Sequence, residues 1–401
     1  MIGLAFRWKL FVPLASVWVS KRFTVRLPLI VNRKGWVKKT LTPGKIRRVK
    51  PGAEQQRTGD MPAKATGKSA KKRAQGTTQS VVLDLSAVIS TVSAGEPRIL
   101  LVENDSETET GRPRLPAGPF DPEGDRTMEE GLRGWVADQT GLNLGFLEQL
   151  YTFGDRFRDP TQRTGGPRPI SVGYVALVLQ SSAKRLAGGS WFDWYRLFPW
   201  EDWRGGAPPI LSEVIQSQLV DWAADGETKP EKRIRRERAD VVFGFGDVGW
   251  DADRVLERYE LLYEAGLVAE TVADGRIRTK QDQIDVHQLM GLPLAQDHRR
   301  ILATALGRLR GKIRYRPVIF EVMPAEFTLL QLQRAVEGLA GAPLHKQNFR
   351  RLVATEGLVE PTGRISAETG GRPAELFRFR HDVVRERPAP GVRVPRRRRA
   401  K

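Results

Sequence analysis

Stretches of aliphatic and β-branched residues begin near Ser80 and alternate with a helical pattern. Four of them predict β-strands, at residues 80–90, 98–103, 147–153 and 169–179. Between the second and third, residues 127–139 predict a helix, with Thr127 as its N-cap and Glu130 three positions later. This mixture of strands and helices over residues 80–204 predicts an α+β domain.

Beyond residue 204, apolar residues recur at helical spacing. They predict three helices, at residues 210–224, 251–265 and 297–311. The charged stretch KPEKRIRRERAD, at residues 229–240, is predicted to be a surface loop. We therefore expect a mostly helical insertion over residues 205–296, followed by a helix over residues 297–314 that completes the first domain.

A separate C-terminal unit is predicted over residues 315–384, in the order strand, helix, turn, helix, hairpin. Its first helix follows Thr328 and reaches Leu339, and its second helix covers residues 344–355 and ends before Gly357. A basic tail follows from residue 385.

The second helix of this unit has two unlike faces. Phe349, Leu352 and Val353 share one face and are expected to pack inward. The other face carries residue types that read base edges and phosphates, namely Lys346, Gln347, Arg350 and Arg351. In the hairpin, Arg364 and Arg372 stand beside glycines, which favours a close approach to a nucleic-acid groove. The alternative interpretation is a helical hairpin with a solvated basic face.

The net charge of +19 is concentrated at the two ends of the chain. The first 79 residues carry 19 Lys and Arg against Glu54 and Asp60, and the last 17 carry eight against Glu386. Residues 80–384 are mildly acidic. Basic tails favour binding to polyanions, although the run Arg396–Arg399 is also compatible with a solvated chain end.

Composition excludes several kinds of site. The 401 residues include no cysteine, which rules out disulfides, thiolate metal sites and cysteine nucleophiles. No two of the four histidines stand at i, i+4, so structural roles are predicted for them. No stretch reaches the roughly 18 apolar residues that a membrane span needs.

The N-terminal segment, residues 1–79, is expected to be basic and either disordered or extraneous. Residues 10–19 faintly resemble a signal-peptide core, but basic residues follow at once without a clear cleavage site. Met61 opens a second plausible start with a Lys-rich leader. We expect residues 1–60 to be an upstream extension.

Residues 115–142, LPAGPFDPEGDRTMEEGLRGWVADQTGL, resemble the Nudix box. In that family the box is a loop–helix–loop whose glutamates hold divalent metal ions against a pyrophosphate. The resemblance places Trp135 in the first glutamate slot of the helix, and Asp138 and Gln139 in place of the Glu-Glu pair. The early glutamate slot falls at Arg126 or Gly124, because the loop is two residues longer than the pattern.

Only Asp138 keeps a carboxylate at a pattern position of the box. One carboxylate cannot assemble a Mg²⁺ cluster, so the resemblance implies a Nudix domain without catalysis and without a metal site. The alternative is an ordinary amphipathic helix in which LPAG and DQTGL match by chance.

Residues 151–178 resemble the segment that follows the box in Nudix proteins that handle ADP-ribose. The match rests on a Gly-Asp…Arg-Asp-Pro loop and a Ser-Val-x-Tyr strand. It implies a ligand site formed by Arg158, Arg163, Arg168, Ser171 and Tyr174. Arginines on a loop can clamp a diphosphate bidentately, and an aromatic ring can stack on adenine.

Residues 317–379 resemble the C-terminal domain of Nudix-related regulators of NAD metabolism, and residues 297–322 fit the junction of the same family. The resemblance covers about residues 80–384. The implied fold class is α+β: a Nudix-like α/β/α sandwich with a helical insertion, followed by a winged helix-turn-helix domain. The insertion is longer than in the family's compact members.

This resemblance implies a DNA-binding transcriptional regulator, expected to repress genes of NAD biosynthesis or salvage. Its effector would be ADP-ribose or a related NAD metabolite, with no required cofactor. The expected partners are a pseudo-palindromic double-stranded operator and a second copy of the chain, without a membrane, in a cytoplasmic, nucleoid-associated setting. Two other classes stay open: an active Nudix hydrolase (ADP-ribose pyrophosphatase) with an appended nucleic-acid-binding domain, and a constitutive DNA- or RNA-binding architectural protein.

Overall fold

The structure is a computed structural model that describes residues 80–104, 111–155, 165–179, 186–275, 281–366, 373–386 and 391–392. All of them belong to one compact unit of the chain, Arg73–Lys401. The expected N-terminal extension, the second start at Met61 and most of the basic tail lie outside the described residues. So do three predicted site residues, Arg158, Arg163 and Arg372.

A mixed sheet with β1 at its centre forms the first domain. Its strands are β1 (Val81–Ser93), β2 (Glu96–Leu101), β3 (Ala117–Pro119), β4 (Phe146–Phe153), β5 (Arg168–Leu177) and β6 (Ser190–Asp193). The strand order is β4-β5-β1-β2-β6, and β3 also pairs with β1. β1 runs parallel to β5, whereas its pairings with β2 and β3 are antiparallel. The four predicted strands are all present, and the predicted α+β class is confirmed.

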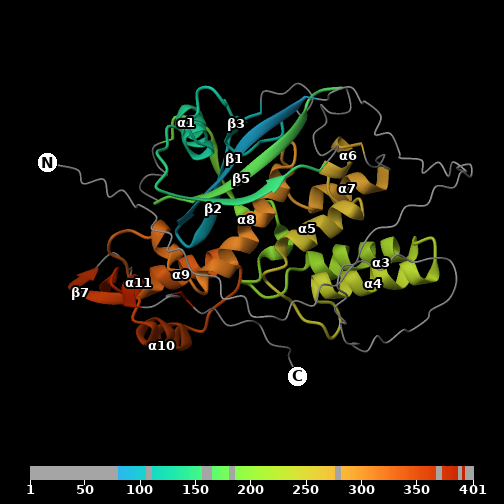
Figure 1. The fold of residues 1–401 in the computed structure, drawn as a ribbon. Coiled ribbons are helices and arrows are strands. Elements are labelled where there is room, and N and C mark those ends of the chain that lie inside the picture. Colours follow the sequence, from blue (N-terminus) through green and yellow to red (C-terminus); the bar gives the residue numbers. More distant parts are fainter. Residues whose placement is uncertain are drawn as a thin grey trace, which may run out of the picture. The chain divides into compact units, whose positions relative to one another are not determined.

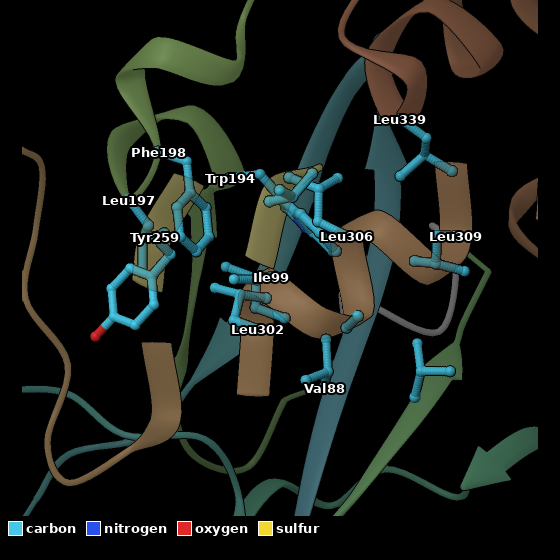
Figure 2. Packing of buried hydrophobic residues seen from close by; sticks show 14 of the residues in the cluster. Val88, Ile99, Trp194, Leu197, Phe198, Tyr259, Leu302, Leu306, Leu309 and Leu339 are labelled. Atoms are coloured by element: carbon cyan, nitrogen blue, oxygen red, sulfur yellow. The ribbon is translucent and has the colours of Figure 1, made fainter. Parts of the chain in front are cut away.

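One helix covers each face of this sheet: α1 (Met128–Thr140) on one side and α8 (His298–Ile313) on the other (Figure 1). Successive residues of β1 therefore serve two cores. Leu85, Ala87 and Ile89 pack in a cluster with α1. Val88 belongs to the larger cluster on the α8 side, where Figure 2 shows it with Ile99 beside Leu302 and Leu306. A strand buried on both faces has a nearly continuous apolar sequence, as β1 does.

Two 3-10 helices, η3 (Trp194–Arg196) and η4 (Pro199–Glu201), follow the sheet. The helices of the insertion come next: the π-helical turn η5 (Leu211–Ile215), α3 (Gln216–Ala224), α4 (Lys229–Phe243), α5 (Val255–Glu264), α6 (Glu270–Ala273) and α7 (Gln281–Leu289). α3 packs on α4, and α5 packs on α8. The insertion therefore shares its core with the sandwich, as the ring of Tyr259 beside Phe198 shows in Figure 2.

The predicted surface loop at residues 229–240 is wrong, because these residues form most of α4. Thr228 caps the helix by accepting a hydrogen bond from the Glu231 backbone N–H at 3.3 Å. Ion pairs one turn apart then neutralise the charged run; Glu231 holds Arg235 at 2.7 Å, for example. Such i, i+4 pairs stabilise a helix that has few apolar residues.

The C-terminal unit comprises η6 (Val318–Val322), α9 (Leu329–Ala340), α10 (Lys346–Glu356), β7 (Val359–Ser366), β8 (Ala374–Phe379) and α11 (Val383–Glu386). Both predicted helices and the antiparallel hairpin are confirmed. The predicted cap at Thr328 is a full capping box with Gln331, whose side chain accepts from the Thr328 N–H at 2.7 Å.

The strand predicted at the start of this unit is wrong. Val318, Ile319 and Val322 are buried in the 3-10 helix η6, which packs against α8. Helical spacing brings these apolar residues onto α8. Within residues 315–328, all of which the structure describes, the one strand-like pairing is the bridge between Phe327 and Phe377.

No helix in the described part of the chain is long and apolar enough to cross a membrane.

Candidate functional site

Trp135 of α1, in the first glutamate slot of the degenerate box, holds the preceding strand β3. Trp135 donates from its indole Nε1 to the Pro119 carbonyl at 2.9 Å. Its ring lies so close to Gly118 that a Cβ there would come within 2.2 Å of it. Position 118 of β3 can therefore be occupied only by glycine while tryptophan occupies the glutamate slot.

Gln139, which takes the second place of the Glu-Glu pair, acts in the same way. Its side-chain oxygen accepts from the Ala117 N–H at 3.1 Å, and its side-chain nitrogen donates to the Ala117 carbonyl at 2.8 Å. A carboxylate could satisfy only the first of these bonds. Trp135 and Gln139 thus connect β3 to α1 at two positions where the Nudix pattern has metal-binding glutamates.

The acidic residues near the box do not converge. Asp138 is exposed on α1, while Glu130 pairs with Arg126 and Glu129 pairs with Arg133. In the described ranges, no three His, Asp or Glu side chains stand close enough to hold a metal ion.

Replacing Gln139 by glutamate is expected to lower the free energy of unfolding by about 1–3 kcal/mol. The Ala117 carbonyl would lose the closer of its two donors, keeping only Arg114 at 3.2 Å, and would face a carboxylate oxygen. Urea denaturation at neutral pH measures the change. Asp138→Asn, one position away and exposed, is the matched control and should change it by no more than about 0.5 kcal/mol. Equal stability of wild type and Gln139→Glu would contradict the role given to this amide.

The structure brings only part of the predicted ligand site together. Arg168 opens β5 and donates to the Gly154 carbonyl at 2.5 Å. The Ser171 hydroxyl lies 3.0 Å from that of Ser86. Tyr174 lies on the other face of the sheet from Ser171, buried in the cluster with α1. Burial, together with the charge of Glu129, raises the pKa of the Tyr174 hydroxyl.

Ser171 lines a small cavity between the sheet and the start of α8. Its other lining residues are Asp84, Phe153, Asp155, Pro169, Gln296, Asp297, His298 and Ile301. Three of these are carboxylates, and Arg300 pairs with two of them, Asp155 at 2.6 Å and Asp297 at 3.1 Å.

His298 stays uncharged at the edge of this cavity. Burial, with a smaller effect from Arg114, lowers its pKa to about 3. Its Nδ1 accepts from the Leu115 N–H at 3.0 Å. The imidazole therefore acts as a fixed link between α8 and Leu115, the first residue of the box.

In the C-terminal unit, α10 presents the amphipathic arrangement that its sequence predicts. Phe349 and Val353 are buried, and Leu352 is half-buried against the same core. The four predicted contact residues are all exposed: Lys346, Gln347, Arg350 and Arg351. They form a polar, cationic face on a helix whose opposite side is fixed in the core.

The hairpin after α10 is held near the start of α9. Arg364 on β7 is exposed and forms an ion pair with Glu326. Because the Arg364 side chain is exposed, it can exchange Glu326 for a phosphate. A helix pair followed by such a hairpin is the arrangement of a winged helix.

Residues 319–379 match the family model of the NrtR DNA-binding winged helix domain. This segment of the C-terminal unit is therefore similar to a winged helix domain of the NrtR type. Over 96 residues, 24% of this chain, the sequence is 41% identical to the ADPR responsive transcriptional repressor NtrR of Acinetobacter baylyi. The match spans 38% of the length of that curated relative.

Solved structures of NrtR and of a MutT/nudix family protein are also similar to this chain. The structure of Shewanella oneidensis NrtR complexed with a 27mer DNA is 22% identical, with a TM-score of 0.45, and covers 76% of this chain and 95% of its own. The NUDIX domain of that protein complexed with ADP ribose is 24% identical, with a TM-score of 0.25, over 29% of this chain and 74% of its own. A MutT/nudix family protein from Enterococcus faecalis is 13% identical, with a TM-score of 0.42, over 76% and 88%.

The C-terminal unit is joined to the rest of the protein by a buried charge cluster, which we call the junction cluster: Glu201, Arg258, Arg310 and Tyr195. Glu201 on η4 accepts from Arg258 of α5 at 2.6 and 3.0 Å, and from Arg310 of α8 at 2.5 Å. All three side chains are almost completely buried.

The junction cluster also holds the end of α9. Arg310 donates to the Leu339 carbonyl at 3.4 Å, and the Tyr195 hydroxyl donates to the Gly338 carbonyl at 2.6 Å. Burial, partly offset by Arg310, raises the pKa of Tyr195 to about 12, so the hydroxyl keeps the proton it donates. The carbonyls at the end of a helix need such donors.

The sequence analysis identified none of these four residues. Arg258 and Arg310 stand 57 and 109 positions from Glu201, so no local motif contains them. Glu201, Arg258 and Arg310 each have a charged neighbour within two positions of the sequence, so no local pattern marks them as buried.

Proposed function

We propose that this protein is a DNA-binding transcriptional repressor that responds to ADP-ribose or a related NAD metabolite. The observation that carries the proposal is α10, with its apolar side in the core and four polar or cationic side chains exposed. It lies within a segment that matches a DNA-binding winged helix model. The relative named an ADPR responsive repressor supports the same function.

DNA recognition is assigned to α10 and the hairpin. Lys346, Gln347, Arg350 and Arg351 would contact base edges and phosphates in the major groove, and Arg364 and Arg372 would lie along the backbone or the minor groove. We infer a homodimer, which requires a pseudo-palindromic operator whose half-sites lie about one helical turn or a multiple of it apart. NAD biosynthesis or salvage genes are the proposed targets.

Effector binding is assigned to the sandwich, with Arg158, Arg163 and Arg168 as phosphate contacts and Ser171 at the neighbouring cavity. Tyr174 would act from the α1 side of the sheet, where it is packed. An effector alters DNA affinity only if it binds the two states of the dimer unequally.

The sandwich is expected to be catalytically silent. Trp135 and Gln139 form hydrogen bonds to β3, and Asp138 is the one carboxylate kept at a pattern position of the box. Purified protein with Mg²⁺ or Mn²⁺ should release no AMP from ADP-ribose above the level of a control without protein. Efficient metal-dependent release would instead favour the hydrolase with an appended nucleic-acid-binding domain.

Arg168→Ala is expected to weaken ADP-ribose binding about tenfold or more, because a guanidinium–phosphate hydrogen bond is charge-assisted. Calorimetry on both proteins measures the change, and equal melting temperatures confirm an intact fold. Arg233→Ala serves as the control, since Arg233 lies on α4 with 75% of its side chain exposed. Unchanged affinity in Arg168→Ala would move the effector site elsewhere.

The decisive experiment retains genomic DNA fragments on the full-length protein, with and without ADP-ribose. We expect a small set of palindrome-containing fragments whose retention changes with ADP-ribose. Retention of all fragments alike, or retention that ignores ADP-ribose, would favour the architectural protein over a regulator.

A further inference from the structure

A second cavity lies where the helical insertion meets the sandwich, away from Ser171. We call it the insertion cavity. Its volume is about 700 Å³, and its lining residues are Arg112, Arg196, Ala269, Val272, His287, Gln288, Gly291, Leu292 and Pro293. None of them lines the cavity at Ser171. α6 and α7, the two short gold helices of Figure 1, contribute one wall.

The charged residues among the described lining of the insertion cavity are of one sign. Two guanidiniums line it, Arg112 from the β2–β3 connection and Arg196 from η3, and no carboxylate is among its described lining residues. Arg196 is exposed, and no acidic side chain in the described ranges forms an ion pair with it. Arg196 differs in this from Arg258, which Glu201 neutralises in the core. The insertion cavity thus attracts an anion.

The other lining residues provide an apolar wall and a polar corner. Val272, Leu292 and Pro293 offer an apolar surface to the organic part of a ligand. His287 is buried, and its Nε2 lies 3.0 Å from the Gly266 carbonyl, to which it can only donate. The Nδ1 of that ring and the Gln288 amide remain as polar groups for a ligand. Apolar walls with a few polar groups are typical of small-molecule sites, whose volumes run to about 300–1,000 Å³.

The wall beside Arg196 is fixed by the backbone. The Leu292 N–H donates to the Arg196 carbonyl at 2.9 Å. Gly291 has φ +82°, and a Cβ there would lie 2.7 Å from the same carbonyl. Buried Arg299 adds a hydrogen bond to the Leu197 carbonyl at 3.0 Å. The cavity is therefore formed before any ligand binds, which lowers the entropic cost of binding.

We propose that the insertion cavity binds an organic phosphate, with Arg112 and Arg196 holding the phosphate and the apolar wall packing against the organic group. Guanidinium groups match phosphate oxygens bidentately. This site is separate from the proposed effector site and does not depend on the proposed function. Binding at the insertion cavity would make the protein responsive to a second metabolite.

Calorimetry on the full-length protein tests this proposal with AMP and ribose 5-phosphate as charged probes and adenosine as the uncharged control. At least one charged probe should bind at millimolar concentration or below, and adenosine should bind at least about tenfold more weakly than AMP. Arg196→Ala should weaken binding of the charged probe by about tenfold or more, since Arg196 is exposed and its loss should leave the fold intact. Gln288→Glu keeps the size of the side chain, adds a like charge and should also weaken binding.

Two control variants separate this site from the rest of the protein. Arg233→Ala, on α4, should bind the charged probe as the wild type does. Arg168→Ala should also bind the charged probe as the wild type does, although we expect that variant to bind ADP-ribose about tenfold or more weakly. If neither charged probe binds, or if Arg196→Ala and Gln288→Glu both bind it as tightly as the wild type, the insertion cavity is not a phosphate site.

Discussion

Replacing Glu201 by alanine is expected to lower the free energy of unfolding by about 3–5 kcal/mol, because it leaves two buried guanidiniums without their counter-charge. Arg258 and Arg310 are almost completely inaccessible to water and cannot turn outward to become solvated. Denaturant unfolding at neutral pH gives the change. Glu237→Ala is the matched control, since Glu237 forms an exposed pair with Arg233 at 3.7 Å and should contribute no more than about 1 kcal/mol.

The same carboxylate should make stability depend on pH. Burial alone would raise the pKa of Glu201, but the charges of Arg258 and Arg310 outweigh it and the pKa is lowered. A lowered pKa means that the stabilisation is complete at neutral pH and is lost as the pH falls through the folded-state value. Glu201→Ala should therefore lose less stability on acidification than the wild type. An unchanged unfolding free energy in this variant would show that the junction cluster does not hold the fold together.

Replacing Arg350 or Arg351 by alanine is expected to weaken binding to the specific operator by about 1–3 kcal/mol for a residue that pairs with guanine. Both side chains are exposed on α10, so the fold should be unaffected. Gel-shift titrations on the operator and on a scrambled duplex measure the loss of specificity.

Two controls accompany this experiment. Arg233→Ala removes an exposed helical arginine outside the winged helix and should leave operator binding unchanged. Deleting Arg396–Arg399 should weaken binding to both duplexes alike and flatten its dependence on salt, because contacts to phosphates release counterions without reading sequence. If both α10 variants bind the operator as the wild type does, α10 is not the recognition helix.

Local patterns were sufficient to predict most elements of the fold. The capping residue Thr328 and the apolar face of α10 act within a few positions of the chain, so their sequence carries the information. Residues 229–240 were predicted to form a loop because they lack apolar periodicity. The helix α4 is instead stabilised by the Thr228 cap and by ion pairs one turn apart.

The candidate sites were harder to predict, because they depend on which face of an element a residue occupies and on distant partners. Ser171 and Tyr174 are three positions apart on one strand, and strand alternation places them on opposite faces. The sequence held that signal, although the family resemblance joined both residues in one site. Glu201, Arg258 and Arg310 meet only through the packing of η4, α5 and α8, which no local pattern encodes.

The bonds from Tyr195 and Arg310 to the end of α9 limit how the protein can be divided. A segment cut at residue 319, where the match to the winged helix model begins, would leave the donors for the Gly338 and Leu339 carbonyls behind. The DNA-binding domain is therefore poorly suited to be moved as a cassette onto another sensor. A functional chimaera needs a boundary that keeps η3, η4 and α8 together with α9, so the recombinable unit is larger than the sequence family suggests.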